Sequence, residues 1–406
     1  MPPSGKSGRP VHSGKRINQG NKINPDEIVG KFREIYGGMP ALTRSPGRIN
    51  LIGEHTDYND GFVLPGAIDK EVVLALKPNG QKKIRIYASD LDQSVEVANS
   101  NLKRNNKRWP NYLFGVVDQL QKSGYDVPGF DCLFASDIPI GAGLSSSAAI
   151  ECGLAFALNE LFGFKLGSVE LAKLSLKAEQ DFAGLNCGIM DQFANLFGKE
   201  NQVIRLDCRS LDHIYFPLRL QDHEIILCDT CVKHSLASSE YNTRRKECEE
   251  GVAILKRSDK RISSLRDVSP AMITSHEVEL PEKVFMRCRY VADEIRRVET
   301  ACRDLEMNDI NSFGAKMYET HAGLARIYEV SCDELDFLVE IAGDSGVTGS
   351  RMMGGGFGGC TINLVNREVA EAFIDKILKK YSRKFQIEPL IYRVNIKNGT
   401  SMIRLN

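Results

Sequence analysis

Four charged or titratable side chains lie within ten residues near the start of the chain, in the segment SPGRINLIGEHTDYNDGFVLPGAID at 45–69. These four residues are Arg48, Glu54, His55 and Asp57. The run INLI at 49–52 would anchor the backbone in a core, and the Gly, Asn and Asp residues that follow favour turns. We therefore expect the polar side chains on a bent loop at the mouth of a strand. Such a loop could hold a polyhydroxyl ligand, and a solvated turn is the alternative.

A second segment, GAGLSSSAA at 141–149, combines two glycines with three serines ahead of a helix-like run. Glycines let the backbone approach an anion, and a helix directs its N-terminal N–H groups and positive dipole end at that anion. The pattern favours a polyphosphate, although no GxxxxGK[ST] motif occurs in the chain. Gly141 and Gly143 also match half of a dinucleotide fingerprint, with Ser146 in place of its third glycine. A tight helix-packing turn is the alternative.

A third segment, RMMGGGFGGC at 351–360, has almost no side chains around Phe357. Each glycine in regular structure costs roughly 0.5–1 kcal/mol of conformational free energy relative to alanine. This cost suggests that the loop closely approaches a ligand or another part of the backbone. A flexible hinge is the alternative, but the apolar runs that flank the loop disfavour it.

Asp191 is a polar exception on an apolar helical pattern. Met190, Phe193 and Phe197 have helical spacing and are expected in the core, with Asp191 and Gln192 beside them. A carboxylate there could accept a proton from a substrate hydroxyl, with a cation such as Arg48 offsetting its charge. A helix-capping or surface aspartate is the alternative.

The composition is that of a globular protein with no strong charge bias. Of the 406 residues, 42% are hydrophobic, and 53 basic side chains balance 53 acidic ones. A net charge of zero gives no electrostatic footprint for nucleic acid or a membrane surface, and no apolar run approaches the 18 residues of a membrane span. Eleven scattered cysteines suit reduced thiols of a cytosolic protein, and the lone CxxC at 228–231 has no second pair for zinc.

The order of elements predicts two mixed domains. We expect a disordered basic tail at 1–23, an N-terminal α/β domain at 24–205 and a C-terminal α+β domain at 206–406. Helices are expected from Pro25, with Asn24 as the cap, at 109–120, from the serine segment to about 162, at 168–182 and at 367–385, and 238–342 reads as mostly helical. Strands are expected at 71–78, 83–89, 94–99, 130–140, 202–208, 223–230 and 389–397.

Taken in order, the four motifs resemble one family. GRINLIGEHTDYNDGFVLP, PIGAGLSSSAA, CGIMDQF and GSRMMGGGFGGC are similar to the motifs of the galactokinase family within the GHMP small-molecule kinases. The resemblance covers the chain from about Asn24 to its end. It implies a fold of two domains with mixed sheets and helices, and an active site in the cleft between them. Met353 departs from the threonine that is common at its position, a change that we expect to be tolerated.

The resemblance implies that ATP phosphorylates α-D-galactose at C1, giving α-D-galactose 1-phosphate and ADP with Mg²⁺ as the metal. By the same resemblance, Asp191 accepts the proton of the C1 hydroxyl, and Arg48 orients that carboxylate and neutralises charge on the transferring phosphoryl group. The residues that would bind the sugar are Glu54, His55, Asp57, Gly188 and Tyr241.

The resemblance also implies the nucleotide and metal sites. The residues that would contact ATP are Trp109 and Tyr112 beside the adenine, with Gly141, Gly143, Leu144, Ser145, Ser146 and Ser147 around the phosphates. A hydroxyl of Ser146 or Ser147 and the carboxylate of Glu179 would bind Mg²⁺. Without the resemblance, Trp109 would be an amphipathic core residue and Glu179 a solvated helix residue. We further expect a cytoplasmic monomer with no nucleic-acid or membrane partner.

Two rival interpretations remain. One keeps the fold and changes the sugar to N-acetylgalactosamine or galacturonate, which the intact HTDYNDG segment disfavours. The other is a sensor that binds sugar and ATP without turnover. Sensors of that kind resemble the enzyme but lack the small dipeptide after the serines, and Ser147-Ala148 is present here.

Overall fold

The computed structural model describes residues 22–185, 187–233 and 237–404. The expected tail at 1–23 lies almost wholly outside the described residues, so its expected disorder remains a prediction. The first described helix, α1 (Pro25–Tyr36), begins as expected: the side chain of Asn24 accepts a hydrogen bond from the Asp26 N–H, and Pro25 occupies the first turn.

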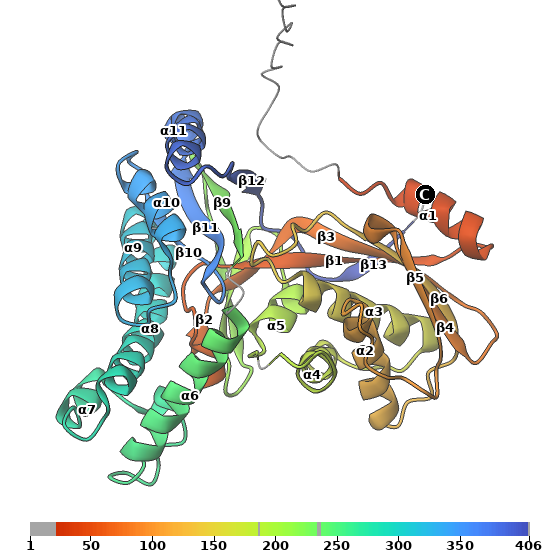
Figure 1. Ribbon diagram of the computed structural model, residues 1–406, viewed down its shortest axis with the longest axis horizontal. Coiled ribbons are helices and arrows are strands. Elements are labelled where there is room, and N and C mark those ends of the chain that lie inside the picture. The colour runs from red at the N-terminus through yellow and green to blue at the C-terminus, as the bar shows by residue number, and fades with distance from the viewer. Residues whose placement is uncertain (1–21, 186, 234–236, 405–406) are drawn as a thin grey trace, which may run out of the picture.

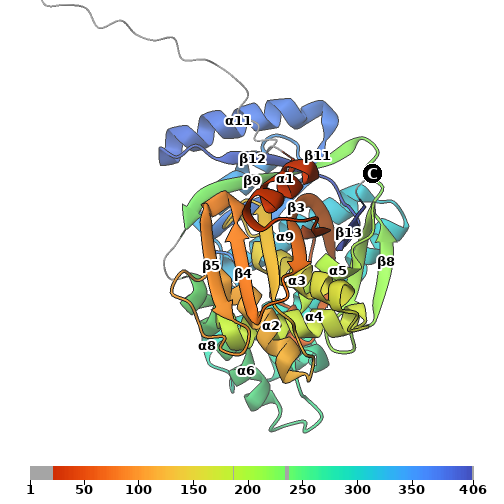
Figure 2. The same ribbon diagram turned by 90° about the vertical axis from the view of Figure 1, so that its right-hand side faces the viewer.

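The largest sheet carries the first sequence motif. Its six strands have the order β13-β1-β3-β6-β4-β5, with β4 and β6 parallel and the other neighbours antiparallel (Figure 1). Their bounds are β1 (Ala41–Asn50), β3 (Pro65–Pro78), β4 (Lys83–Ala88), β5 (Gln93–Ala98), β6 (Phe130–Ser136) and β13 (Ser401–Ile403). One face packs on α1, whose Phe32 is fully buried with Val73 and Leu133 (Figure 2).

Helices that carry the serine segment and Asp191 cover the other face of this sheet (Figure 1). They are α2 (Pro110–Lys122), α3 (Ser146–Phe162), α4 (Ser168–Lys177), the π-helical segment η3 (Ala178–Ala183) and α5 (Met190–Phe197). The helix expected at 168–182 is therefore an α-helix that continues as one π turn. A three-stranded sheet, β2 (Phe62–Val63), β7 (Gln202–Asp207) and β8 (His213–Pro217), follows.

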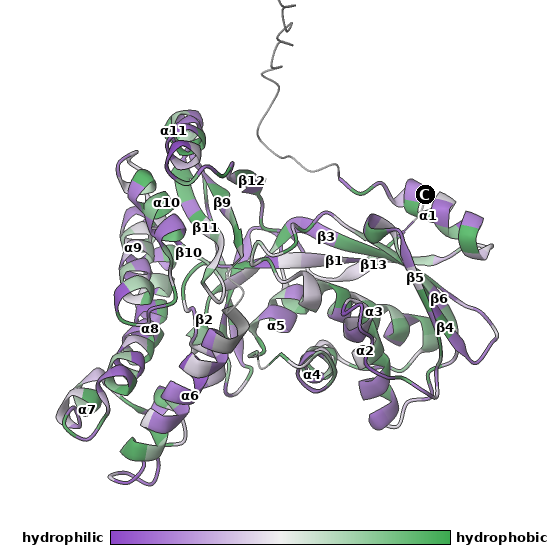
Figure 3. Ribbon diagram, in the orientation of Figure 1, coloured by the Kyte–Doolittle hydropathy of each residue, from purple (hydrophilic) through white to green (hydrophobic). Residues whose placement is uncertain are grey.

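The second half of the chain is mostly helical, with a four-stranded antiparallel sheet of order β10-β11-β9-β12. Its strands are β9 (His223–Lys233), β10 (Gly349–Met352), β11 (Gly358–Asn366) and β12 (Leu390–Val394). Its helices are α6 (Ala237–Leu255), α7 (Pro270–Ser275), α8 (Glu282–Glu306), α9 (Ile310–Arg326), α10 (Asp333–Gly343) and α11 (Arg367–Phe385). Hydrophilic and hydrophobic residues alternate along these helices, as expected for helices with one buried side (Figure 3).

Two strands cross the expected division of the chain. β7 spans the boundary placed between residues 205 and 206, and β13 returns from the end of the chain to pair with β1, for example Thr43 with Met402. The division into 24–205 and 206–406 remains a prediction, and any such division must assign β13 to the sheet of the first half. β13 was not predicted, because three residues carry too little periodicity.

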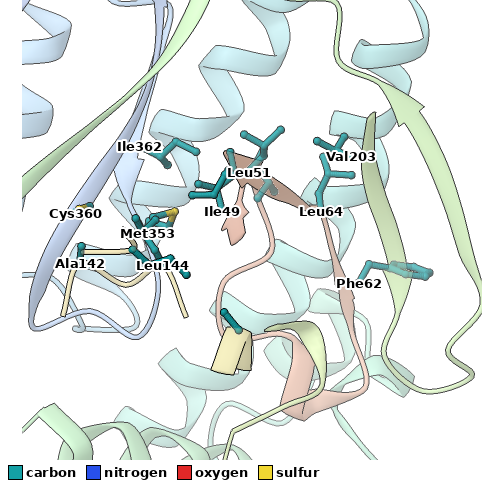
Figure 4. Close-up of a cluster of buried hydrophobic side chains, with 14 of the residues drawn as sticks. Ile49, Leu51, Phe62, Leu64, Ala142, Leu144, Val203, Met353, Cys360 and Ile362 are labelled. Carbon is teal, nitrogen blue, oxygen red and sulfur yellow. The ribbon is translucent and has the colours of Figure 1, made fainter. Parts of the chain in front are cut away.

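The main core joins the halves where the motifs meet. Side chains from β1, the serine segment and the glycine segment gather in one buried cluster, in which Ile49, Leu144 and Met353 lie together (Figure 4). Met353 is 1% exposed, so the position that departs from the family pattern is a core position. Burial of each such apolar side chain stabilises the folded state by about 1.5–3 kcal/mol. The packed cluster therefore holds the ends of the loops that lead out of it.

Among the described residues, no helix is both long and apolar enough to cross a membrane. All eleven cysteines are free, and Cys132, Cys152 and Cys302 are buried as expected. Cys228 is buried while Cys231 is exposed. In the described ranges, no three His, Cys, Asp or Glu side chains form a metal-binding group, so the CxxC gains no partners for zinc there.

Candidate active site

Arg48 and Asp191 make a two-point ion pair at the centre of the site. Nε of Arg48 donates to Oδ1 of Asp191 at 2.7 Å, and Nη2 donates to Oδ2 at 2.9 Å. Ser145 Oγ donates to the same Oδ2, and Nη1 of Arg48 donates to the Gly143 carbonyl. Two-point pairs of this kind fix the plane of the carboxylate as well as its charge. Arg48 and the serine segment therefore hold Asp191 in one orientation.

Arg48 itself lies in a strand, which corrects the expectation that the whole polar cluster sits on a loop. β1 continues through Asn50, and Arg48 pairs with Ala67 just after a register shift between Pro46 and Arg48. The local sequence SPGR gave turn signals, but pairing with β3 overrides them. Asp191 occupies the first turn of α5, where a carboxylate interacts favourably with the helix dipole.

Glu54 and Asp57 lie on the expected bent loop after β1. Glu54 is 2% exposed, and its Oε1 accepts a hydrogen bond from the Gly354 N–H at 2.8 Å. Asp57 begins a short 3-10 turn. Burial, followed by the nearby carboxylates of Asp191 and Glu54, raises the pKa of Asp57 to about 7. The loop thus places two carboxyl groups beside Asp191.

Gly188 makes room for Asp57. A β-carbon added at Gly188 would lie 2.1 Å from Oδ2 and 2.5 Å from Cγ of Asp57, closer than real contacts allow. The backbone of Gly188 lies outside the left-handed region, so the requirement for glycine here comes from space alone. Residue 186, two positions before Gly188, lies outside the described residues.

His55 is a neutral imidazole packed among aromatic rings. Its backbone has a φ of +64°, and its ring lies 5.4 Å from that of Tyr241 and 4.8 Å from that of Tyr328. Burial lowers the pKa of His55 to about 3, so the ring carries no charge near neutrality. Nδ1 lies 2.8 Å from the hydroxyl of Tyr58, while Nε2, buried, has no hydrogen-bond partner among the described residues. That nitrogen is available to a ligand.

One pocket collects all seven residues predicted for catalysis and sugar binding. Its lining includes Arg48, Glu54, His55, Asp57, Gly188, Asp191 and Tyr241. Cys187, Met190, Gly354 and Gly355 also line it and were not assigned to the site from sequence. Cys187 and Met190 each adjoin a predicted residue, and the two glycines belong to the segment for which close approach was expected. Adjacency could thus have found the first two, and the glycine pattern could have found the other two.

The serine segment forms the turn that leads into α3. Gly141, Gly143 and Ser145 have φ values of +84°, +75° and +56°, and Ser146 is the first helical residue. Leu144 is 1% exposed, so its side chain belongs to the core, and its carbonyl accepts from the Arg48 N–H at 3.2 Å. Only the backbone of Leu144 can therefore face a ligand. The segment adjoins Asp191 through Ser145.

Ser147 and Glu179 face each other with hard oxygen donors. Oγ of Ser147 donates to Oε1 of Glu179 at 2.8 Å, and Gln192 Nε2 and Cys187 Sγ donate to Oε2 at 2.7 and 3.3 Å. Burial, followed by the Asp191 carboxylate, raises the pKa of Glu179. A hydroxyl and a carboxylate are donors that suit Mg²⁺, which usually takes one or two protein oxygens and completes its shell with phosphate and water. The residues present therefore fit Mg²⁺.

Trp109 and Tyr112 lie at the start of α2, outside the lining of the sugar-site pocket. Nε1 of Trp109 donates to Gln93 at 3.0 Å, and its ring meets that of Phe134 edge-on at 5.7 Å. Burial, followed by the carboxylate of Glu179, raises the pKa of Tyr112 to about 12. The Tyr112 hydroxyl therefore experiences the negative charge of Glu179.

Comparison with known sequences identifies the family of the chain. Family models match residues 111–199 (GHMP kinases N terminal domain), 30–78 (galactokinase galactose-binding signature) and 298–383 (GHMP kinases C terminal). A galactokinase of Roseiflexus sp. is 40% identical over 95% of this chain and 98% of its own length. One of Thermosipho africanus is 41% identical over 89% and 99%.

The chain belongs to the galactokinase family. A crystal structure of Lactococcus lactis galactokinase complexed with galactose superposes with a TM-score of 0.89 at 33% identity, covering 93% of this chain and all of that one. A Methanococcus jannaschii mevalonate kinase, at 18% identity and a TM-score of 0.63, shares the fold. The GHMP kinase fold with mixed sheets and helices, expected from sequence, is thereby confirmed.

Proposed function

We propose that this chain, a kinase of the galactokinase family, transfers the γ-phosphoryl group of ATP to the C1 hydroxyl of α-D-galactose. The products are α-D-galactose 1-phosphate and ADP. The observation that carries the proposal is the single pocket in which the Arg48–Asp191 pair adjoins the carboxyl groups of Glu54 and Asp57. Sugar phosphorylation requires a pocket that holds a polyhydroxyl ligand beside a proton acceptor.

Asp191 is the proposed base. Its carboxylate takes the proton of the C1 hydroxyl as that oxygen bonds to the γ-phosphorus, while the bond from the γ-phosphorus to the bridging oxygen of ADP breaks. Arg48 holds the carboxylate at two points and supplies positive charge beside the transferring group. Positioning and charge stabilisation are the main contributions a protein makes to phosphoryl transfer.

The sugar would be bound by the acidic loop and the aromatic wall. Glu54 and Asp57 accept hydrogen bonds from sugar hydroxyls, the unpartnered Nε2 of His55 offers one more polar atom, and the Gly188 backbone with the Tyr241 side chain completes the pocket. Hydrogen bonds to charged groups contribute roughly 1.5–3 kcal/mol each, so two carboxylates can discriminate between sugar epimers.

ATP would lie along the serine segment. Backbone groups at 141–147 and the N-terminus of α3 offer donors to its phosphates, and Trp109 and Tyr112 flank the adenine. Ser147 and Glu179 are the proposed protein ligands of Mg²⁺. When bound, Mg²⁺ would supply positive charge that offsets the negative charge of the phosphates.

ADP release from a panel of sugars tests the activity. We expect turnover with ATP and galactose, and turnover at least a hundredfold lower with N-acetylgalactosamine, galacturonate and glucose. If the chain phosphorylated galacturonate or N-acetylgalactosamine faster than galactose, that sugar would replace galactose as the proposed substrate. Galactose binding without ADP release would establish the sensor interpretation instead.

The cellular setting and assembly are also proposals. We infer a cytoplasmic monomer that acts on small molecules, on the grounds of the balanced charge and the reduced cysteines. Light scattering on the purified chain tests the assembly: a mass of about 45 kDa supports a monomer, since the chain itself weighs 45.2 kDa. A mass near twice that value would contradict it.

A further inference from the structure

Arg351, the first residue of the glycine segment, is a fully buried cation that contacts the loop at 51–61 after β1, which we call the sugar loop. It lies in β10 and is 0% exposed. Its Nε donates to the Leu51 carbonyl at 2.7 Å, Nη2 donates to the Asn50 carbonyl, and Nη1 donates to the carbonyl of Met352. A buried charge is costly unless it is paired and hydrogen-bonded, so such a residue needs a compensating partner.

The compensating partner is Glu54, from the opposite end of the chain. Nη2 of Arg351 lies 3.1 Å from Oε1 of Glu54, and the N–H of Gly354 donates to the same oxygen at 2.8 Å. Among the residues that the structure describes, Oε1 takes both of these bonds and Oε2 takes none. The carboxylate is therefore fixed at one oxygen, and the other oxygen remains to accept a hydrogen bond from a ligand.

Helix α8 holds the backbone of the same loop independently. Oε1 of Glu294 accepts from the Gly53 N–H at 2.8 Å, and the hydroxyl of Tyr290 donates to the Glu54 carbonyl at 3.2 Å. Glu294 is itself 0% exposed and is also bonded to Thr320. Arg351 therefore shares the hold on the loop backbone with α8, and it adds to this its own contact with the Glu54 carboxylate.

We propose that Arg351 is a positioning residue for sugar recognition, which orients the Glu54 carboxylate through Oε1 so that Oε2 faces the hexose. The inference rests on the proposed function and extends it to a residue outside the pocket lining. It predicts that Arg351 governs affinity for the sugar and not for the nucleotide, and that the effect on the sugar is transmitted mainly through Glu54.

A double-mutant cycle tests this coupling. Arg351→Lys keeps the charge but cannot reach all four acceptors, and we expect it to weaken galactose binding, measured by calorimetry, at least tenfold while KM for ATP changes less than threefold. In a Glu54→Gln background the same substitution should weaken binding less than threefold, because no charged carboxylate remains to be positioned. Equal factors in both backgrounds, or an equal rise in KM for ATP, would overturn the proposal.

Arg287 provides a matched control. It is also 0% exposed, and it bonds to the Ile327 carbonyl, to Glu247 at 3.0 Å and to Glu329. Within the described part of the chain, no hydrogen bond joins Arg287 to the sugar loop. We expect Arg287→Lys to lower Tm and leave the affinity for galactose within twofold. If it weakens galactose binding as much as Arg351→Lys does, general destabilisation explains both results and the proposal fails.

Thermal unfolding separates this proposal from the proposed function. If the unmodified chain bound no galactose, the proposed activity would fail, yet the losses of Tm in Arg351→Lys and Glu54→Gln should still be less than additive in the double variant. If no Arg351 variant folds, Glu54→Ala alone must lower Tm, because it leaves a buried guanidinium without its carboxylate. An unchanged Tm in Glu54→Ala would refute the pairing.

Discussion

Arg48 and Asp191 lie 143 positions apart in the chain, yet they share two hydrogen bonds. Gly188 and Tyr241 were expected in the pocket only through the family resemblance, and Cys187 and Met190 were not expected there. Residue types and spacing identified the five charged or titratable candidates (Arg48, Glu54, His55, Asp57 and Asp191), because these residues stand out in short motifs. They could not predict Arg351, because its importance comes from strand β10 placing it beside Glu54. The left-handed backbone of His55 was equally hidden, since its φ is imposed by packing.

The prediction for Gly188 concerns the close contact between its backbone and the Asp57 carboxyl. Gly188→Ala would put a methyl group 2.1 Å from Oδ2 of Asp57, so we expect the carboxyl to be displaced and KM for galactose to rise at least tenfold. Steady-state kinetics measures this. The control is Gly30→Ala in α1, where no atom lies within 4 Å of the new methyl group and kinetics should be unchanged. Normal KM in Gly188→Ala would place Asp57 outside the sugar site.

At Asp57 the prediction concerns pH. With a pKa of about 7, the group is half ionised near neutrality, and the ionised form accepts the stronger hydrogen bonds from sugar hydroxyls. Galactose should therefore bind up to about tenfold more tightly at pH 8 than at pH 6, a bound set by the change in the ionised fraction. Calorimetry should show this slope flattening in Asp57→Asn. An equal slope in that variant would assign the titration to another group.

The raised pKa of Asp57 also determines the direction in which the free energy of unfolding changes with pH. The folded pKa of Asp57 lies above its ordinary value of 3.8, so the folded state retains a proton that the unfolded chain releases. The stability associated with the neutral carboxyl is fully present below pH 3.8 and is lost as pH rises toward 7. Asp57→Asn should remove this contribution to the pH dependence of the free energy of unfolding.

At the scale of elements, the long periodic segments were predictable and the short ones were not. α11 occupies the expected range of 367–385, and the expected strands at 83–89 and 94–99 correspond to β4 and β5. β1 was missed because its interior Pro46 and Gly47 resemble a turn, while pairing with β3 and β13 supplies the missing stability. Sheet contacts thus override local propensity where the site is built.

The glycine segment between β10 and β11 gives a prediction at this scale. Gly356 has a φ of +85°, and an added β-carbon would lie 2.1 Å from the Val330 carbonyl, which accepts from the Phe357 N–H at 2.8 Å. We expect Gly356→Ala to reduce the free energy of unfolding by about 2–4 kcal/mol, combining backbone strain with overpacking. Urea denaturation measures the loss.

Gly346→Ala is the matched control for that loss. Its φ is +69°, but no atom lies within 4 Å of the added methyl group, so only the backbone cost of about 1 kcal/mol should appear. Similar losses in the two variants would show that the contact with Val330 contributes nothing. Gly356 would then matter for its conformational freedom alone.

At the scale of the whole molecule, the site exists because distant segments share one core. The sugar loop follows β1, Asp191 begins α5, and Gly354 and Gly355 come from the second half, all around the cluster that contains Ile49, Leu144 and Met353. The sequence motifs predicted that these segments meet, through the resemblance to a family. Physical reasoning on each motif alone left a solvated turn, a packing turn and a hinge open.

The central claim is that Asp191 receives the proton of the reacting sugar hydroxyl. Asp191→Asn keeps the shape of the side chain but removes the proton acceptor, so ADP release with galactose should fall by roughly 10²–10⁴-fold or more. Galactose affinity, measured on the same preparation by calorimetry, should stay within about tenfold. Turnover near that of the unmodified enzyme, with galactose still bound, would contradict the account.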